Sequence, residues 1–404
     1  MSLRAASLCV LLFASTATAE PLSLSDALVR AEEVSAAVQL QQLSSESAEA
    51  QYLSDPRAGA PSVRIGLRDL DIRTDTNPDP SPVEVVTRLR FPFPRPWDLS
   101  AAATLGKATV AREEAELEGI REGLRVAVIR RFHAVPLMRQ GVEWAQQLTA
   151  LRAQHLQLVA ELRGEGLATA LDWLESEEER RDADDARATR AARLESTEAE
   201  LRLLLSWPVN EPLELVAIPT EDRAAMPLPT IENLNEGLAD RDPDVREAEA
   251  EIRRSEARLR RLQLSALPWL DWAQGGAVFK RDTPVSFEVG VAIDVPIYMW
   301  SAARTRAASQ DISAAKLQLT DARASAEQEL ARRLREAAAA KERWAVEKEH
   351  LDAVIEHVTP LLDVADPLLK LELQSRLARA NLRVLSALID LIDDLDRLNG
   401  EAHR

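Results

Sequence analysis

Two stretches of this sequence have a helical pattern over lengths that no compact domain of this size can contain. They occupy 98–163 and 300–365, 66 residues each, and each holds one internal proline, Pro136 or Pro360. At about 1.5 Å of rise per residue, a continuous helix of that length would span about 100 Å. Rods of this kind occur in filaments, coiled-coil spacers and tubes that cross a wide compartment. The sequence therefore predicts a mainly α fold built on very long helices.

Apolar residues recur in the helical regions at alternating spacings of four and three. One seam consists of Trp144, Leu148, Leu151, His155, Leu158 and Leu162, and another of Leu373, Leu377, Ala380, Val384, Leu388, Leu391, Leu395 and Leu398. Such a seam buries one stripe of a helix against its neighbours, as in coiled coils. Only 13 glycines, 8 tryptophans, 2 tyrosines and 6 phenylalanines occur in 404 residues, a composition that also favours long helices.

Residues 1–19 have the order of a secretory signal peptide. Arg4 precedes an apolar run at 5–14, and small residues follow at 17–19, just before Glu20. The apolar run is far shorter than the ~20 residues of a membrane-spanning helix, and no later segment offers a longer one. Cys9, the only cysteine, lies in this leader, so we expect no disulfide, thiolate metal site or cysteine nucleophile in the mature chain.

Charge and motif content argue against several classes of function. The formal net charge of -17 does not suit nucleic acid, because phosphate binding needs clustered Lys and Arg. His350 and His357 lie near several glutamates, but a spacing of seven residues places them about 10 Å apart on one helix face, too far for one ion. We interpret this region as a solvated face. Without convergent His, Cys or Gly-rich motifs, we expect no enzyme, no cofactor and no metal site.

Two places alternate in the manner of β-strands. At 285–295 the apolar set is Val285, Phe287, Val289, Val291, Ile293 and Val295, and the residues between them are small, polar or charged. This length matches the ~9 to 11 residues of a tilted membrane strand with its apolar face toward lipid. A half-buried strand of a soluble sandwich is the alternative. Residues 63–68 and 83–91 alternate more weakly, with arginines on one face that suit a water-filled lumen, and 71–82 between them predicts an exposed loop.

Three landmarks recur in one order at nearly one offset. The tetrapeptide at 60–63 corresponds to that at 267–270, the proline triplet at 91–93 to that at 295–297, and Trp97 to Trp300, at offsets of 207, 204 and 203 residues. We therefore predict two internal repeats, 20–206 and 231–404, joined by a proline-rich linker at 207–230. Each repeat contains a helix, two strands (near 62–91 and 269–295) and a long helical hairpin, with tips near 166 and 366.

Four stretches resemble the TolC-like outer-membrane efflux family, also called outer-membrane factors. They are Leu22–Leu28 (LSLSDAL), Gly166–Leu174 (GLATALDWL), Leu201–Pro208 (LRLLLSWP) and Arg241–Glu249 (RDPDVREAE). The resemblance covers nearly all of the mature chain. It implies a homotrimer in which each chain gives four strands to one 12-stranded membrane β-barrel and its long helices to a tube that extends into the periplasm. The implied location is the outer membrane of a Gram-negative-type bacterium.

The function that this resemblance implies is passive conduction in a tripartite efflux or type I secretion system. Substrates would be loaded by an inner-membrane pump through a periplasmic adaptor protein that docks on the helical tips. Drug, metal ion and polypeptide would all use the same tube, so the sequence does not specify the cargo. The alternative is a periplasmic coiled-coil adaptor or scaffold without a barrel, which would explain the helices and the leader but not the duplicated strand pairs.

The resemblance also assigns candidate site residues. The adaptor-docking tip would consist of Gly166, Leu167, Ala168, Thr169 and Asp172. Gly166 alone also suits an ordinary helix C-cap, but the residues that follow it in the family's pattern favour docking. The second tip lacks a matching glycine turn and instead carries Asp363 and Asp366, which in three copies would form an acidic, cation-sensitive pore constriction. The simpler interpretation is that Asp366 only caps its helix, with Pro367 as first helical residue. Aromatic residues beside the strand ends, from Phe91 to Trp300, suit either an interfacial belt or core packing.

Overall fold

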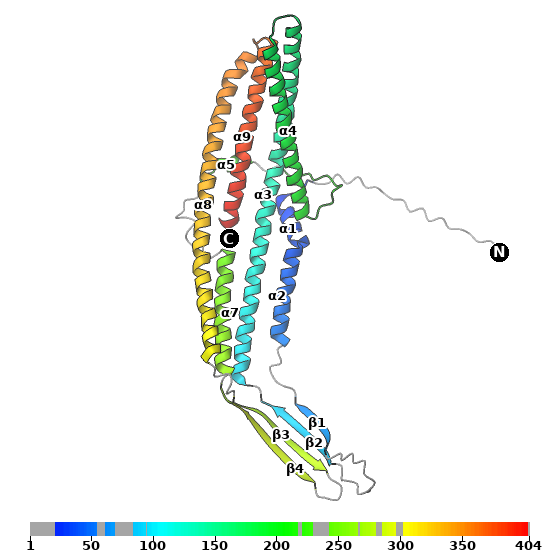
Figure 1. Ribbon diagram of the computed structural model, residues 1–404, viewed down its shortest axis with the longest axis vertical. Helices are drawn as coiled ribbons and strands as arrows, with labels where there is room; N and C mark the ends of the chain where they lie inside the picture. The colour runs from blue at the N-terminus through cyan, green and yellow to red at the C-terminus, as the bar shows by residue number, and fades with distance from the viewer. Residues whose placement is uncertain are drawn as a thin grey trace, which may run out of the picture. The chain divides into compact units, whose positions relative to one another are not determined.

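The computed structural model describes residues 21–54, 61–68, 84–93, 95–216, 220–228, 242–265, 267–279, 285–295 and 302–402. The predicted leader at 1–19 and the predicted loop at 71–82 lie outside these residues. Figure 1 shows the elements in chain order: α1 (Leu24–Val34), α2 (Ala36–Ser54), β1 (Ser62–Arg68), β2 (Glu84–Pro92), α3 (Pro96–Gly164), α4 (Ala170–Leu204), α5 (Thr220–Ala225), α7 (Pro243–Ser265), β3 (Trp269–Phe279), β4 (Ser286–Asp294), α8 (Ala302–Leu362) and α9 (Pro367–Ala402).

The chain forms two compact units. Unit 1 comprises Met1–Ser35, Gly123–Leu228 and Arg333–Gly400, and unit 2 comprises Ala36–Glu122, Pro229–Arg332 and Glu401–Arg404. These units differ from the repeats predicted at 20–206 and 231–404, because α3 and α8 each supply residues to both units. No described helix has an apolar stretch that could cross a membrane.

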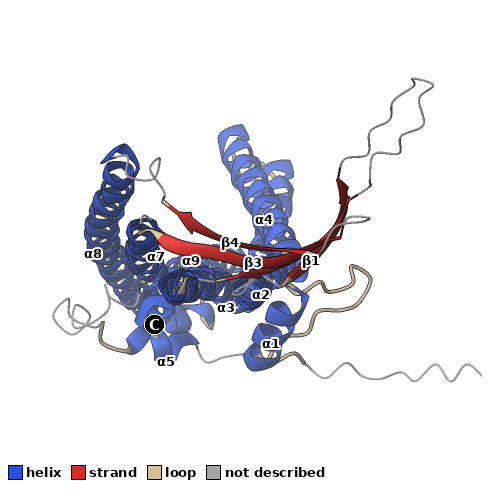
Figure 2. Ribbon diagram, turned by 90° about the horizontal axis from the view of Figure 1, so that it is seen from below, coloured by secondary structure: helices blue, strands red, loops and turns tan. Residues whose placement is uncertain are grey.

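Unit 2 contains a single antiparallel sheet with the strand order β1-β2-β3-β4. Figure 2 shows the four strands side by side in one curved layer. The predicted strands at 63–68, 83–91 and 285–295 match β1, β2 and β4 within a residue or two. In β3 the register shifts between Leu270 and Trp272, which leaves Asp271 at a bulge.

The helices of unit 2 approach one another closely through small residues. Ala101, Ala108, Ala257, Ala308 and Ala315 are all buried. A Cβ atom at Gly119 of α3 would lie 3.0 Å from Cβ of Pro243, so the glycine lets α3 lie against the start of α7. Arg112 of α3 holds the same helix through Glu247 at 3.1 Å and Glu251 at 3.4 Å.

Unit 1 contains three apolar clusters, and they bear out only part of the predicted seams. In α9 the seam residues Leu373, Ala380, Leu388, Leu391 and Leu398 are buried. In α3 only Leu148 of the predicted seam is buried, and the other seam residues are half-buried. Within the seam region at 144–162, the residues that are buried together with Leu148 are Ala145, Arg152 and Val159. The buried stripe of α3 is therefore rotated toward α4 and α9, and it admits a charged residue.

The described parts of the proline-rich segment, residues 207–216 and 220–228, pack into unit 1, although the sequence predicted a linker without helix. Leu213 is buried in the cluster around Phe132. Leu22 pairs with Leu215 in a parallel bridge: the Leu22 N–H donates to Glu214 at 2.8 Å, and the Val216 N–H donates to Leu22 at 3.0 Å. Residues 220–225 then form α5, whose Ala224 is fully buried. Prolines prevent a long helix here, but extended backbone can still pair with the N-terminal segment.

Candidate functional site

One face of the sheet is apolar across all four strands. The register places Val63 opposite Leu89, Leu89 opposite Gly275, and Gly275 opposite Val289. Paired residues of an antiparallel sheet lie on the same face, so these form one row across the sheet. On β4 this face is also well exposed, with Phe287 at 82% and Val289 at 85%. Val63, Ile65, Val85, Leu89, Phe91, Phe279, Val291 and Ile293 are further exposed apolar residues of the strands.

The opposite face carries the charges. Arg88 of β2 donates to Glu288 of β4 at 2.9 Å, and Arg90 lies 3.4 Å from Asp271. The Arg90 guanidinium also stacks over the ring of Trp272 at 4.4 Å. A sheet that is apolar on one face and charged on the other fits lipid on one side and water on the other.

Two tryptophans meet where the strands join the helices of unit 2. The rings of Trp97 and Trp269 lie edge to face at 4.7 Å, and the indole N–H of Trp269 donates to the Phe93 carbonyl at 2.9 Å. This contact favours the packing interpretation for these two aromatics. Phe91 and Phe93 remain exposed, as a belt would require, and Tyr298 and Trp300 lie outside the described residues.

The first tip, between α3 and α4, is fixed by two complementary capping motifs. Gly166 has φ of +78°, and the N–H groups of Gly166 and Leu167 donate to Arg163 and Leu162 at 3.1 and 2.9 Å. This is the hydrogen-bond pattern of a Schellman motif. Thr169 and Asp172 then form a capping box for α4, at 3.2 Å for the Asp172 N–H and 2.7 Å for the Thr169 N–H. Hydrogen bonds from the Thr169 backbone and hydroxyl lower the pKa of Asp172.

Other side chains of this tip take no part in capping and are exposed to solvent. Leu167 is 72% exposed, and Leu171 and Leu174 of the first turns of α4 are also exposed. Ala168 is half-buried. Three exposed leucines around a rigid turn form an apolar surface of a kind that marks binding sites. The sequence motif identified Leu167, but Leu171 and Leu174 were recognisable only once the helix register was known.

The second tip has a simpler architecture. The Ala365 N–H donates to the Leu361 carbonyl at 2.9 Å and closes α8. The Asp366 carboxylate accepts from the Leu369 N–H at 2.9 Å, so Asp366 is the N-cap of α9, and Pro367 begins that helix. Asp363 and Asp366 are both exposed. Val364, between them, is also exposed.

A buried arginine joins three helices of unit 1 below the tips. Arg152 of α3 is 0% exposed, and its Nη1 lies 2.7 Å from carboxylate oxygens of both Glu179 on α4 and Glu372 on α9. Burial alone would raise the pKa of Glu372, but hydrogen bonds and charge from Arg152 and Arg376 lower it below its ordinary value. Nothing in the sequence pattern singled out Arg152, because an arginine beside a seam is usually solvated.

A second polar cluster lies deeper in unit 1. His133 Nδ1 of α3 is 2.6 Å from Asp396 of α9, and Arg223 of α5 is 2.7 Å from the other oxygen of Asp396. Arg130 and Asp393 pair one turn away at 2.6 Å. His133 and Asp396 are buried, so the contact fixes α3, α5 and α9 to one another.

The described residues contain no group of three or more His, Cys, Asp or Glu side chains placed to hold a metal ion. His350 and His357 are exposed on α8. Neither cluster described above places a nucleophile beside a base in an open pocket.

Comparison with solved structures identifies the fold. The open-state outer-membrane channel MtrE of Neisseria gonorrhoeae matches with a TM-score of 0.70 at 15% identity, over 94% of this chain and 88% of that one. CusC, described as forming a transmembrane channel, matches with a TM-score of 0.66 at 14% identity, over 94% and 91%. The outer membrane protein VceC of Vibrio cholerae matches with a TM-score of 0.64 at 14% identity, over 92% and 96%.

No protein-family model and no curated protein matches the sequence. The likeness to these solved structures shows that the chain shares the fold of outer-membrane channels such as MtrE: mostly helical, with one antiparallel sheet of four strands.

Proposed function

We propose that this chain is the outer-membrane channel subunit of a tripartite efflux or type I secretion system, and that it conducts its substrates passively from the periplasm to the outside. The observation that carries the proposal is the two-faced sheet. Its apolar face is exposed in the single chain, and such a surface needs lipid or protein to cover it. The fold shared with channels such as MtrE supports the same assignment.

We infer a trimer from the edges of the sheet together with the resemblance to the TolC-like family. β1 and β4 each have only one neighbouring strand in the described chain. Hydrocarbon does not tolerate unpaired strand edges, so a membrane sheet must close on itself. Four strands are too few for a barrel, whereas three copies supply the strands of a 12-stranded one. The similar order of elements in the two halves supports an internal duplication behind this architecture.

Fractionation and cross-linking test this proposal together. The sequence contains one cysteine, Cys9, which lies in the predicted leader. The substitutions Ile65→Cys on β1 and Val289→Cys on β4 would therefore introduce the two thiols available for cross-linking in the mature chain. We expect outer-membrane fractionation, a heat-sensitive trimer, and dimer and trimer bands on oxidation of the double variant. Val289→Cys alone serves as the control for cross-linking outside the strand junction. A soluble periplasmic monomer would overturn the proposal and favour a coiled-coil adaptor or scaffold.

The first tip is the docking site that we propose for a periplasmic adaptor coupled to an inner-membrane pump. Gly166, Thr169 and Asp172 would hold the turn, and Leu167 and Leu171 would supply the contact. Leu167→Asp with Leu171→Asp should abolish efflux while the amount of outer-membrane trimer stays unchanged. Leu203→Asp, at an 80% exposed leucine near the other end of α4, is the matched control. Equal loss in both variants would contradict docking at the tip.

The second tip is the pore constriction that we propose. Three copies of Asp363 and Asp366 would place six carboxylates around a narrow opening, which favours cations. Asp363→Asn with Asp366→Asn removes the charge but retains an N-cap residue. Unchanged conductance and unchanged cation dependence of the double variant in planar bilayers would leave Asp366 as a helix cap alone.

A further inference from the structure

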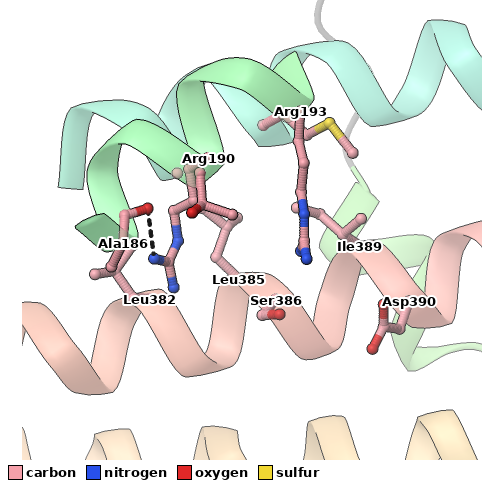
Figure 3. Close-up of a pocket in the computed structure, with 11 residues that line it drawn as sticks. Ala186, Arg190, Arg193, Leu382, Leu385, Ser386, Ile389 and Asp390 are labelled. Atoms are coloured by element: carbon pink, nitrogen blue, oxygen red, sulfur yellow. Dashed lines mark hydrogen bonds between the residues drawn. The ribbon is translucent and has the colours of Figure 1, made fainter. Parts of the chain in front are cut away.

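A groove in unit 1 combines an apolar floor with two arginines that have no acidic partner. It has a volume of about 380 Å³ and lies where α3, α4 and α9 meet. Met138 and Gly141 of α3 and Leu382, Leu385 and Ile389 of α9 supply the floor. A Cβ atom at Gly141 would lie 3.4 Å from Leu385, so α3 and α9 are in close contact beneath the groove. Figure 3 shows Arg190 and Arg193 projecting from α4 toward α9.

Neither guanidinium forms an ion pair within the described part of the chain. The Arg190 guanidinium donates a hydrogen bond to the Ala186 carbonyl of its own helix at 3.2 Å, a carbonyl that also accepts from the helical N–H of residue 190. The Arg193 guanidinium has no hydrogen bond or ion pair to the described residues, although the Arg193 carbonyl accepts a hydrogen bond from the Thr197 hydroxyl at 2.9 Å. Asp390 also lines the groove, but its contact is with Arg343 of α8 at 3.8 Å.

This arrangement contrasts with the other arginines that face helix junctions in unit 1. Arg130, Arg139 and Arg152 all contact carboxylates at 2.6 to 2.7 Å. Burial and then the repulsion from Arg193 lower the pKa of Arg190; Arg190 is half-buried, whereas Arg193 is exposed. An anion placed between them would relieve that repulsion and form charge-assisted hydrogen bonds with both.

We propose that this groove binds an amphiphilic organic anion, with the acid group held by Arg190 and Arg193 and an aryl or alkyl body on the leucine and isoleucine floor. A compact sulfonate or carboxylate suits the volume, which lies at the low end for ligand sites. Asp390, at the end of the groove, would repel a second acid group, so the site favours a single negative charge at one end of the ligand. This inference stands independently of the proposed channel function.

The test uses 1-naphthalenesulfonate and the purified full-length protein in neutral detergent, with saturation-transfer NMR as the readout. For a ligand of this size we expect a Kd on the order of 1 mM. Arg190→Gln with Arg193→Gln should weaken binding roughly tenfold or more. Arg187→Gln, on the same helix but at an arginine paired with Asp184 at 3.8 Å, is the matched control and should bind as the wild type does. The cation 1-naphthyltrimethylammonium, with the same aryl body, should not bind the groove.

Two outcomes would overturn the inference. Equal binding by the double variant and the wild type would mean that the sulfonate enters the detergent or another surface. Loss of the oligomer in the Arg190 and Arg193 variant, with the sulfonate competing for assembly, would mean that a second copy of the chain occupies the groove.

Discussion

Arg152 on α3 and Glu372 on α9 form an ion pair of 2.7 Å around a guanidinium that no solvent reaches. Glu179 on α4 completes it at the same distance. The three helices are thus joined by charge next to the apolar cluster of Leu148, Ala183 and Ala378. The charged cluster restricts how α4 and α9 can face α3, because each carboxylate must meet Arg152. Contacts between leucines alone would not impose this restriction.

Replacing Arg152 by methionine should destabilise unit 1. Removing one partner of a fully buried pair typically costs ~3–5 kcal/mol. The loss here should be smaller, about 2–3 kcal/mol, because the side chains of Glu179 and Glu372 retain 39% and 27% of their exposure. Urea unfolding followed by circular dichroism measures it. The triple variant that adds Glu179→Gln and Glu372→Gln should recover most of the loss, and a triple variant as unstable as the single one would contradict the electrostatic explanation.

Stability should fall in acid through Glu372. Its pKa in the folded chain lies below the ordinary value of 4.5, so the unfolded chain binds more protons as the pH drops past that value. The contribution of Glu372 is therefore complete above about pH 5 and is lost as the pH falls through the folded-state pKa. Urea titrations between pH 6 and 3 should show a shallower pH slope for Glu372→Gln than for the wild type. Parallel slopes would assign the acid sensitivity to other carboxylates.

His155 should make a separate contribution at higher pH. Burial and then the charge of Arg152 lower its pKa below 6.5, and its Nδ1 lies 3.3 Å from the Ser176 hydroxyl. The unfolded chain takes up a proton first as the pH falls through about 6.5, so stability declines there and continues to decline down to the folded-state pKa. His155→Gln should flatten this part of the curve. An imidazole that titrates above 6.5 by NMR would reverse the expected sign.

The glycines of the first tip allow a matched test of its backbone. Gly166 needs φ of +78° and Gly164 does not, and neither has an atom within 4 Å of an added Cβ. Gly166→Ala should therefore strain the Schellman turn by about 1–2 kcal/mol, whereas Gly164→Ala should be neutral or slightly stabilising. Faster hydrogen exchange of the Leu167 amide in the first variant alone would show the strain locally. Equal exchange rates in both variants would mean that the turn tolerates a side chain.

How far the sequence predicts this molecule depends on whether a feature repeats with a period. The seam of α9 and the alternation of β4 are periodic patterns, and the structure confirms both. β3 has no such pattern, because its apolar-face positions at 273, 275 and 277 are Ala, Gly and Ala, so hydrophobicity alone could place its start but not its full length. The roles of Arg152 and of the Arg190–Arg193 pair could not be predicted, because they depend on which faces of three separate helices meet. The capping box, in contrast, was readable as a threonine three residues before Asp172.

The two adjacent glycines of β3 offer a last prediction, about why the middle of this strand has small side chains. Gly275 lies on the apolar face, and a Cβ there would meet no atom within 4 Å. At Gly276, on the charged face, a Cβ would lie 2.8 Å from the Thr87 carbonyl oxygen and 3.0 Å from Cγ of Arg88. The approach of β2 thus requires glycine at 276 only, even though both residues look alike in the sequence.

Gly276→Ala should therefore push β2 and β3 apart, and it should weaken the ion pair between Arg88 and Glu288 that spans β3 from β2 to β4. We expect a lower yield of heat-sensitive oligomer and a lower melting temperature for this variant. Gly275→Ala should leave both unchanged, because its methyl group only extends the exposed apolar face. Equal losses in the two variants would show that strand flexibility, rather than the contact with Thr87, is what the glycines supply. A loss confined to Gly275→Ala would instead place a neighbouring copy against the apolar face.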